Sequence, residues 1–175
     1  MHETEPDIAA LQDLLDRSYD AAGQHLRGIT TPERRVSAAQ LCEQLSGMVL
    51  LVLATVTADG RPIAGPVDGI FYRGSFHFGT SPHAVRARHL RARPQVSATH
   101  LPREEFAVTV HGRALAVDVR VPEGAGLRET LLEIYTPRYG DEWEQFIDPP
   151  DGDEAPVYFR IEAEKMFSFQ MGSGG

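Results

Sequence analysis

The stretch that decides the fold is LATVTADGRPIAGPVDGIFYRGSFHFGTSPHAVRARHLRARPQVSAT, residues 53–99. It opens at the end of a β-branched, apolar segment, and the Asp-Gly pair at 59–60 is the signal for a tight hairpin. The return strand is expected over residues 62–72, broken by Pro66 and Gly69. Closely spaced strands with short turns between them indicate an antiparallel barrel or sandwich.

Further strands are predicted on the C-terminal side of this hairpin. Alternating or apolar segments follow turns at residues 76–79, 95–100, 105–121 and 157–170. With the first hairpin they make about six strands.

Helical spacing of apolar residues is found outside these strands. It predicts an amphipathic helix over residues 7–26, a shorter helix that Ser37 caps and Gly47 ends, and a third helix after Pro122. The segment 141–156 holds seven acids and three prolines, and it is expected to be a loop with one helical turn. The layout is therefore α+β, with an N-terminal helical extension and peripheral helices around the strands.

The length of 175 residues suits one domain, or one domain with an extension. We expect a helical extension at 1–46, a barrel domain at 47–170 and a disordered tail at 171–175.

The charge and composition of the chain exclude some partners. The formal net charge is −8 at pH 7, whereas general nucleic-acid binding needs a broad basic face. The longest apolar run, at 48–54, is too short to span a membrane, and the acidic N-terminus is the opposite of a signal peptide. Cys42 is the only cysteine, so no internal disulfide can form. We therefore expect a cytoplasmic protein with no nucleic-acid or membrane partner.

One segment departs from this acidic balance. Residues 80–94, TSPHAVRARHLRARP, hold four arginines and two histidines with no acid. Ser81-Pro82 is a typical helix start, whose free N–H groups and neighbouring hydroxyls, including that of Thr80, would bind an anion. Arg86, expected one turn into the helix, would reach back to a phosphate there. A solvated basic face is the equally favoured alternative, and the histidine spacing argues against a metal site.

An ordered set of motifs at residues 48–119 resembles the pyridoxamine 5′-phosphate oxidase-like split β-barrel superfamily. The set consists of the Asp-Gly-Arg-Pro hairpin, a Pro-Val pair in the next strand, an aromatic strand that ends in Gly79-Thr80, and a basic helix running into Arg93-Pro94. The resemblance implies a six-stranded antiparallel split β-barrel that forms a homodimer. It also implies that FMN, or the deazaflavin F420, binds at the subunit interface.

The resemblance further implies which residues bind the cofactor. The family holds the flavin phosphate with a threonine at the strand end and with Ser, Arg and Lys in the next helix. Thr80 matches the threonine and Arg86 the lysine, but Ala84-Val85 replaces the Ser-Arg pair, so that Ser81, His83 or Arg88 would have to compensate. The flavin ring would lie along the second strand. The expected set of cofactor-binding residues is Gly65, Pro66, Val67, Asp68, Gly79, Thr80, Ser81, Arg86 and Arg88.

The function expected on this basis is that of an FMN- or F420-dependent oxidoreductase acting on a small organic substrate, with its catalytic residues unassigned. Synthesis of pyridoxal phosphate is not expected, because residues 162–175 lack the Arg- and His-rich segment of the dedicated oxidase. One alternative is a non-catalytic binding protein for haem, F420 or another anionic ligand. A second is a dimeric scaffold whose basic helix pairs with the acidic segment 141–154.

Other side chains that carry chemistry have simpler structural interpretations. Trp143 is expected to anchor a helix rather than to cover a ligand. His77 and His111 are expected to be satisfied barrel residues, whereas His100, at a strand end, is the better candidate for a site. Cys42 is expected to be a small buried residue.

Overall fold

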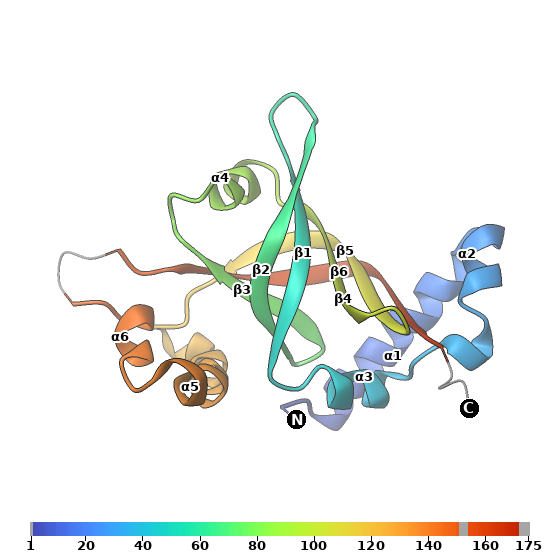
Figure 1. Ribbon diagram of the computed structural model, residues 1–175, viewed down its shortest axis with the longest axis horizontal. Helices are drawn as coiled ribbons and strands as arrows, with labels where there is room; N and C mark the ends of the chain where they lie inside the picture. Colours follow the sequence, from blue (N-terminus) through green and yellow to red (C-terminus); the bar gives the residue numbers. More distant parts are fainter. Residues whose placement is uncertain (1, 151–153, 172–175) are drawn as a thin grey trace.

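Six antiparallel strands close into a barrel in the computed structural model, which describes residues 2–150 and 154–171 (Figure 1). The strand order is β1-β2-β3-β6-β5-β4, and β1 pairs with both β2 and β4, so the sheet has no free end. The predicted α+β barrel is therefore confirmed, and the sandwich that the strand pattern also allowed is excluded. The strands are β1 Met48–Val56, β2 Pro62–Tyr72, β3 Ser75–Thr80, β4 Gln95–Arg103, β5 Phe106–Val117 and β6 Val157–Gln170.

The β1–β2 hairpin forms at the predicted Asp-Gly pair. Gly60 has φ +85°, a conformation that glycine adopts at no steric cost. The expected break in the return strand is wrong, because β2 continues through Pro66 and Gly69. β3 pairs only with residues 69–72 of β2, so one edge of β2 has no neighbouring strand at Pro66, and a residue without an N–H is tolerated there.

Within the described residues, six α-helices pack around the barrel: α1 Glu5–Asp20, α2 Gln24–Ile29, α3 Ala38–Gln44, α4 Val85–Ala92, α5 Ala125–Tyr139 and α6 Trp143–Ile147. The single helix predicted over 7–26 is wrong in extent, because the chain leaves α1 at Ala21 and starts α2 behind Gly23. Ser37 caps α3 as predicted, in a capping box with Gln40. The one helical turn predicted in the acidic segment is α6.

The N-terminal helices share a core with the barrel. Leu11 and Leu15 of α1 and Leu41 of α3 are buried in one cluster with the barrel interior. The Tyr19 hydroxyl donates to the carbonyl oxygen of Ser168 in β6 at 2.9 Å. The division of the chain at residue 46 stays a prediction, and the tail at 172–175 lies outside the described residues.

Helices α5 and α6 lie at the opposite end of the molecule from α2 (Figure 1), and His2, just before α1, comes within 3.8 Å of Glu133 in α5. They bury a second apolar cluster against the outer face of the barrel, where Ile70 of β2 and Tyr158 of β6 meet Leu127, Leu131 and Tyr135 of α5. None of the helices within residues 2–150 and 154–171 combines the length and hydropathy that a membrane span requires.

Candidate functional site

The segment predicted as an anion-binding helix start folds differently. α4 begins at Val85 with Ala84 as N-cap, so the predicted cap at Ser81 is wrong. Pro82 instead occupies the second position of a turn that the Ala84 amide closes by donating to the Ser81 carbonyl oxygen at 3.0 Å. The Ser81 hydroxyl accepts from the His83 amide at 3.3 Å and is therefore used inside this turn.

Three of the four arginines in this segment donate to backbone carbonyl oxygens instead of standing free in solvent. The bonds run from Arg86 Nη2 to Pro66 at 2.9 Å, from Arg91 Nη1 to Pro82 at 2.8 Å and from Arg93 Nε to Val56 at 3.0 Å. Arg88 is exposed on the same helix. Most of the arginines of this segment thus hydrogen-bond α4 and its flanks to neighbouring backbone.

The acidic segment is bound mainly by α5. Arg128 lies 2.8 Å from a Glu144 oxygen and 3.9 Å from Asp148. In the described residues, an ion pair between His83 and Glu154 joins the basic segment 80–94 to the acidic segment 141–156. Among residues 141–150 and 154–156, therefore, no acid pairs with an arginine of α4, and the scaffold hypothesis stays a prediction.

Arg86 lines a hollow of about 240 Å³ between α4 and the β1–β2 hairpin. Its Nη1 is buried and has no hydrogen-bond partner among the described residues, while Nη2 is held by Pro66. Gly65 leaves room beside the guanidinium, since a Cβ there would lie 3.8 Å from Nη2. The Ala84 and Val85 side chains that complete the wall offer no donor. The hollow thus fits one anionic group held by Arg86, with apolar surroundings.

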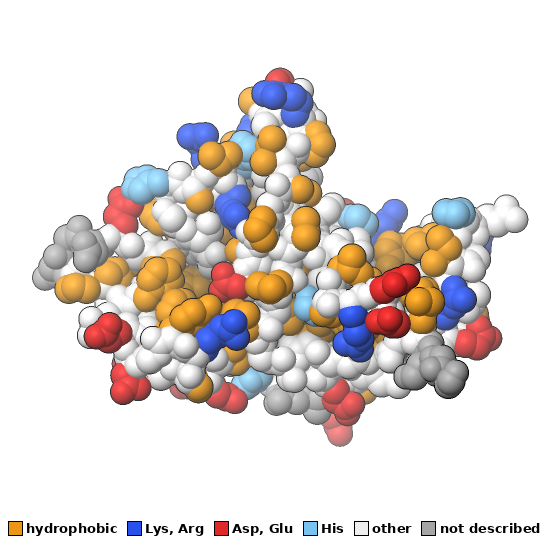
Figure 2. Space-filling model, viewed as in Figure 1, with side chains coloured by type: hydrophobic (Ala, Val, Ile, Leu, Met, Phe, Trp, Pro, Cys, Tyr) orange, Lys and Arg blue, Asp and Glu red, His pale blue; other side chains and the backbone are white. Residues whose placement is uncertain are grey.

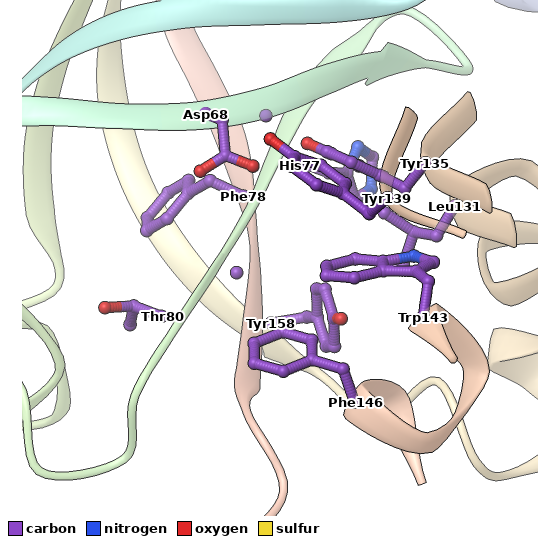
Figure 3. A pocket seen from close by; sticks show the side chains of 12 residues that line it. Asp68, His77, Phe78, Thr80, Leu131, Tyr135, Tyr139, Trp143, Phe146 and Tyr158 are labelled. Atoms are coloured by element: carbon purple, nitrogen blue, oxygen red, sulfur yellow. The ribbon is translucent and has the colours of Figure 1, made fainter. Parts of the chain in front are cut away.

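A second cavity, of about 210 Å³, lies between the barrel and α5–α6 (Figure 3). It brings together Asp68, Gly79 and Thr80, three of the residues predicted for cofactor binding, with His77, Phe78 and a set of aromatic side chains. In Figure 3 the Asp68 carboxylate points into the space that these rings surround. The aromatic set is Tyr135 and Tyr139 of α5, Trp143 and Phe146 of α6, and Tyr158 of β6.

The rings of α5 and α6 pack on one another in a continuous cluster. Trp143 lies with its ring centroid 4.9 Å from Tyr135, 5.6 Å from Tyr139 and 4.6 Å from Phe146. Trp143 therefore anchors its helix, as predicted, and lines the cavity as well. Trp143 Nε1 and the Tyr158 hydroxyl are buried without hydrogen-bond partners among the described residues. Such unsatisfied atoms cost free energy that a purely structural cluster would avoid.

Three titratable groups around the cavity, Tyr135, Tyr158 and His77, have pKa values shifted toward their neutral forms. Burial, together with the nearby Asp68 carboxylate, raises the pKa of Tyr135 and of Tyr158 well above the ordinary tyrosine value. Burial lowers the pKa of His77 to about 4, and the Arg160 guanidinium adds to that effect. At neutral pH Tyr135 and Tyr158 are therefore protonated and His77 is uncharged, and Asp68 supplies the carboxyl group of the cavity lining.

The predicted cofactor residues therefore divide between two hollows. Gly65, Pro66 and Arg86 meet in the hollow beside α4, while Asp68, Gly79 and Thr80 line the aromatic cavity. Val67 points into the barrel core, so only its backbone is available to a ligand. Ser81 and Arg88 are exposed.

The remaining polar candidates are satisfied by the barrel. His100, the better site candidate by sequence, is buried and donates from Nδ1 to the Leu50 carbonyl oxygen at 2.8 Å. His111 hydrogen-bonds the Ser97 hydroxyl at 2.8 Å, and His77 donates to the Ser75 carbonyl oxygen at 3.1 Å. Cys42 is buried as expected, and burial raises the pKa of its thiol to about 12. In the described part of the chain, no group of three or more His, Cys, Asp or Glu side chains is arranged to hold a metal ion.

The sequence interpretation missed most of the aromatic wall. Tyr135 and Tyr139 are spaced i, i+4, and Trp143 and Phe146 are spaced i, i+3, which places each pair on one helix face. This signal was available, but it did not indicate which strand the face would cover. That is determined by the packing of Leu131 and Tyr135 around Ile70 on the outer face of β2.

The family model of pyridoxamine 5′-phosphate oxidase matches residues 38–167. The chain belongs to this family. The match spans α3, the whole barrel up to most of β6, and both hollows described above. No curated protein matches the chain.

Several solved structures share the fold. A conserved hypothetical protein from Mycobacterium tuberculosis superimposes with a TM-score of 0.62 at 24% identity, covering 82% of this chain and 96% of its own. HutZ from Vibrio cholerae, described as a haem storage protein, has a TM-score of 0.58 at 22% identity, covering 77% and 93%. A FAD-binding protein from Mesorhizobium loti has a TM-score of 0.55 at 20% identity, covering 79% and 98%. At these identities the likeness shows the family's fold alone.

Proposed function

We propose that this protein is a cytoplasmic, homodimeric oxidoreductase that uses FMN or F420 and acts on a small organic substrate. The observation that carries the proposal is the Arg86 guanidinium, fixed at Nη2 by the Pro66 carbonyl oxygen, with Nη1 buried and without a hydrogen-bond partner in the described part of the chain. A guanidinium held in this way is ready to donate to a phosphate without further ordering of its side chain.

The residues around Arg86 support an anionic group of this kind. Arg86 would hold the cofactor phosphate, and the backbone of residues 65–68 on the outer face of β2 would support the ring. Thr80, which matches the family's phosphate-binding threonine, lines the aromatic cavity instead of the hollow beside Arg86. When bound, the flavin or deazaflavin would supply the hydride acceptor or donor. The chain itself would position the cofactor and exclude water from it. The FAD-binding protein of the same fold is consistent with a flavin at such a site.

A second copy of the chain is part of the proposal. The two hollows measure about 210 and 240 Å³, below the roughly 300–1,000 Å³ of pockets that enclose drug-sized ligands. A flavin would need the surface of another subunit to complete its site. Apolar side chains suited to such a contact stand exposed on the outer face of β1 and β4, with Leu50, Val52 and Leu101 at 62%, 55% and 61% exposure. Figure 2 shows hydrophobic side chains gathered below the tip of the β1–β2 hairpin.

A non-catalytic binding protein is the second candidate function. It is favoured by Ala84 and Val85, which place two alkyl side chains where the family's phosphate-binding pair would stand. HutZ, described as a haem storage protein, shows that a protein of this fold can serve a binding role.

The two functions are separated by titrating the purified protein with FMN, F420 and haem side by side. Absorption changes of the flavin or deazaflavin that saturate at micromolar concentration support the proposal. A Soret band with haem, and no response to FMN or F420, would favour the binding protein. Binding of none of the three would exclude the oxidoreductase, and a haem- or F420-binding protein with it.

A further inference from the structure

We propose that the aromatic cavity beside Asp68 binds the cationic group of a small organic molecule, such as a methylated or quaternary ammonium. As the identity of a substrate, this inference rests on the proposed function. As a binding property of the cavity, it is independent of any cofactor.

The first argument is the composition of the wall. Five aromatic side chains from three separate elements converge on one cavity of about 210 Å³. The faces of aromatic rings carry partial negative charge, so several rings around one space together attract a cation. Trp143, the strongest of these ring types for a cation, is in contact range of Tyr135, Tyr139 and Phe146.

The second argument is that two rings at the rim are exposed beyond what packing requires. Tyr139 is 55% exposed and Phe146 is 53% exposed, although both belong to the cluster around Trp143. Large aromatic surface left open beside a cavity indicates recognition rather than core formation. Figure 3 shows Phe146 across the cavity from Asp68, with Trp143 beside it.

The third argument is the charge that surrounds the cavity. Asp68 is the carboxylate in the lining, and it contributes to the raised pKa of both Tyr135 and Tyr158. The basic groups nearby are largely compensated. Arg128 is paired with Glu144 and Asp148, and Arg160 lies 3.9 Å from Glu162. Arg138 lies over the Tyr139 ring, with 5.8 Å from its Cζ to the ring centroid.

The segment that supplies Trp143 and Phe146 strengthens this field. Residues 141–156 contain no Lys or Arg, and Asp141 and Glu142, directly before Trp143, are exposed and form no ion pair with the described residues. An acidic approach to a cavity that ends in a carboxylate concentrates cations and disfavours anions. The hollow beside Arg86 has the opposite character, so the two sites would take the phosphate of a cofactor and the cation of a partner molecule separately.

The size of the cavity sets the class of ligand. A volume of about 210 Å³ accepts a trimethylammonium head with a short tail, whereas a haem or a complete flavin does not fit within it. We therefore expect choline and tetramethylammonium to be suitable probes. The neutral alcohol 3,3-dimethylbutan-1-ol has the shape of choline without its charge and is the matched control ligand.

The experiment uses the intrinsic fluorescence of the full-length, cofactor-free protein. Trp143 is the only tryptophan of the chain, so the signal reports on the cavity itself. Choline and tetramethylammonium should change the emission saturably at constant ionic strength, with binding confirmed by calorimetry. The neutral alcohol should bind at least about tenfold more weakly, the scale of a cation–aromatic contact combined with a charge partner.

Two variants and one control test which residues are responsible. Asp68→Asn keeps the shape of the side chain and should weaken choline binding about five- to tenfold. Tyr139→Leu removes a ring at the exposed rim and should weaken it about threefold or more. Asp13→Asn makes the same charge change at an exposed position of α1, outside the cavity lining, and should have less than a twofold effect.

The outcomes distinguish this inference from the proposed function. Equal binding of choline and the neutral alcohol, or no saturable response to either cation, would overturn the inference while leaving the FMN and F420 titration intact. Cation binding that persists unchanged in both cavity variants would place the ligand elsewhere and overturn it too. Cation binding in a protein that takes up neither cofactor would uphold the inference as a binding property and reject the oxidoreductase.

Discussion

The guanidinium of Arg86 donates from Nη2 to the carbonyl oxygen of Pro66 at 2.9 Å, across the open edge of β2. The bond joins the start of α4 to the strand along which the cofactor ring would lie. Pro66 lacks an N–H and β3 pairs with β2 only from residue 69 onward, so this carbonyl lies beside an edge without a neighbouring strand. The Arg86 side chain thus satisfies a backbone carbonyl at this edge, and the same hydrogen bond orients its guanidinium.

Replacing this arginine should identify the anion site. Arg86→Ala is expected to weaken FMN or F420 binding by about 1.5–3 kcal/mol, roughly 10- to 150-fold, because it removes a charge-assisted hydrogen bond to the phosphate. Arg88→Ala changes the same charge on the same helix, but its side chain is exposed, so a loss of less than about threefold is expected. Equal losses in the two variants would indicate general attraction by the helix and contradict a specific contact at Arg86.

Glycine at position 112 is required by the contact between β5 and β6. A Cβ there would lie 2.1 Å from the Glu162 carbonyl oxygen, and the strand register shifts between His111 and Gly112. Gly112→Ala is therefore expected to destabilise the protein by about 2–4 kcal/mol, since backbone atoms must move. Gly28→Ala, in α2 with no atom within 4 Å of the new Cβ, should be neutral or stabilising by up to about 1 kcal/mol. Denaturant midpoints at unchanged m-value measure both, and equal midpoints would contradict the prediction.

The fold could be predicted from local signals because each is carried by neighbouring residues. The Asp-Gly pair at 59–60 and the alternating strands specify hairpins, and Ser37 with Gln40 specifies the start of α3. The signals failed where two local motifs compete. Ser81-Pro82 suits both a helix start and a turn, and the structure uses it as a turn that ends at Ala84.

The candidate site was only partly predictable, because its two halves depend on different information. Arg86, Pro66 and Gly65 lie within 22 residues of one another in the sequence, and the family motif identifies them together. The aromatic cavity joins Asp68 of β2 to Tyr135 of α5 and Tyr158 of β6, which lie far apart in the sequence. Helical spacing shows that the rings of α5 share a face, but only tertiary packing places that face over Asp68.

His77 should make the protein sensitive to mild acid. Burial lowers its pKa to about 4 in the folded protein, against 6.5 for an ordinary histidine, so only the unfolded chain takes up the proton between these values. The free energy of unfolding therefore keeps this contribution above pH 6.5. It falls as the pH drops toward 4, by about 2–3 kcal/mol at pH 4.5. His77→Asn places an amide N–H near the position of Nδ1, so it keeps a donor for the Ser75 carbonyl oxygen and removes the titration. Denaturation at pH 7.5 and 4.5 should show a smaller acid loss in the variant, and equal losses would contradict the assignment.

Leu50 should control the association of two chains. Its side chain is 62% exposed on the outer face of β1, beside Val52 on the same strand, and burying such apolar surface favours a dimer. Leu50→Glu would place a charge in the contact without altering the barrel interior, so light scattering should report a monomer where the unmodified protein is a dimer. Val121→Glu makes the same kind of change at another exposed apolar position, 40% exposed, and should leave the dimer intact. A monomeric unmodified protein, or a Leu50→Glu variant that stays dimeric, would reject this face as the interface. If the cofactor site is completed by the second subunit, the monomeric variant should also lose FMN or F420 binding although Arg86 is unchanged.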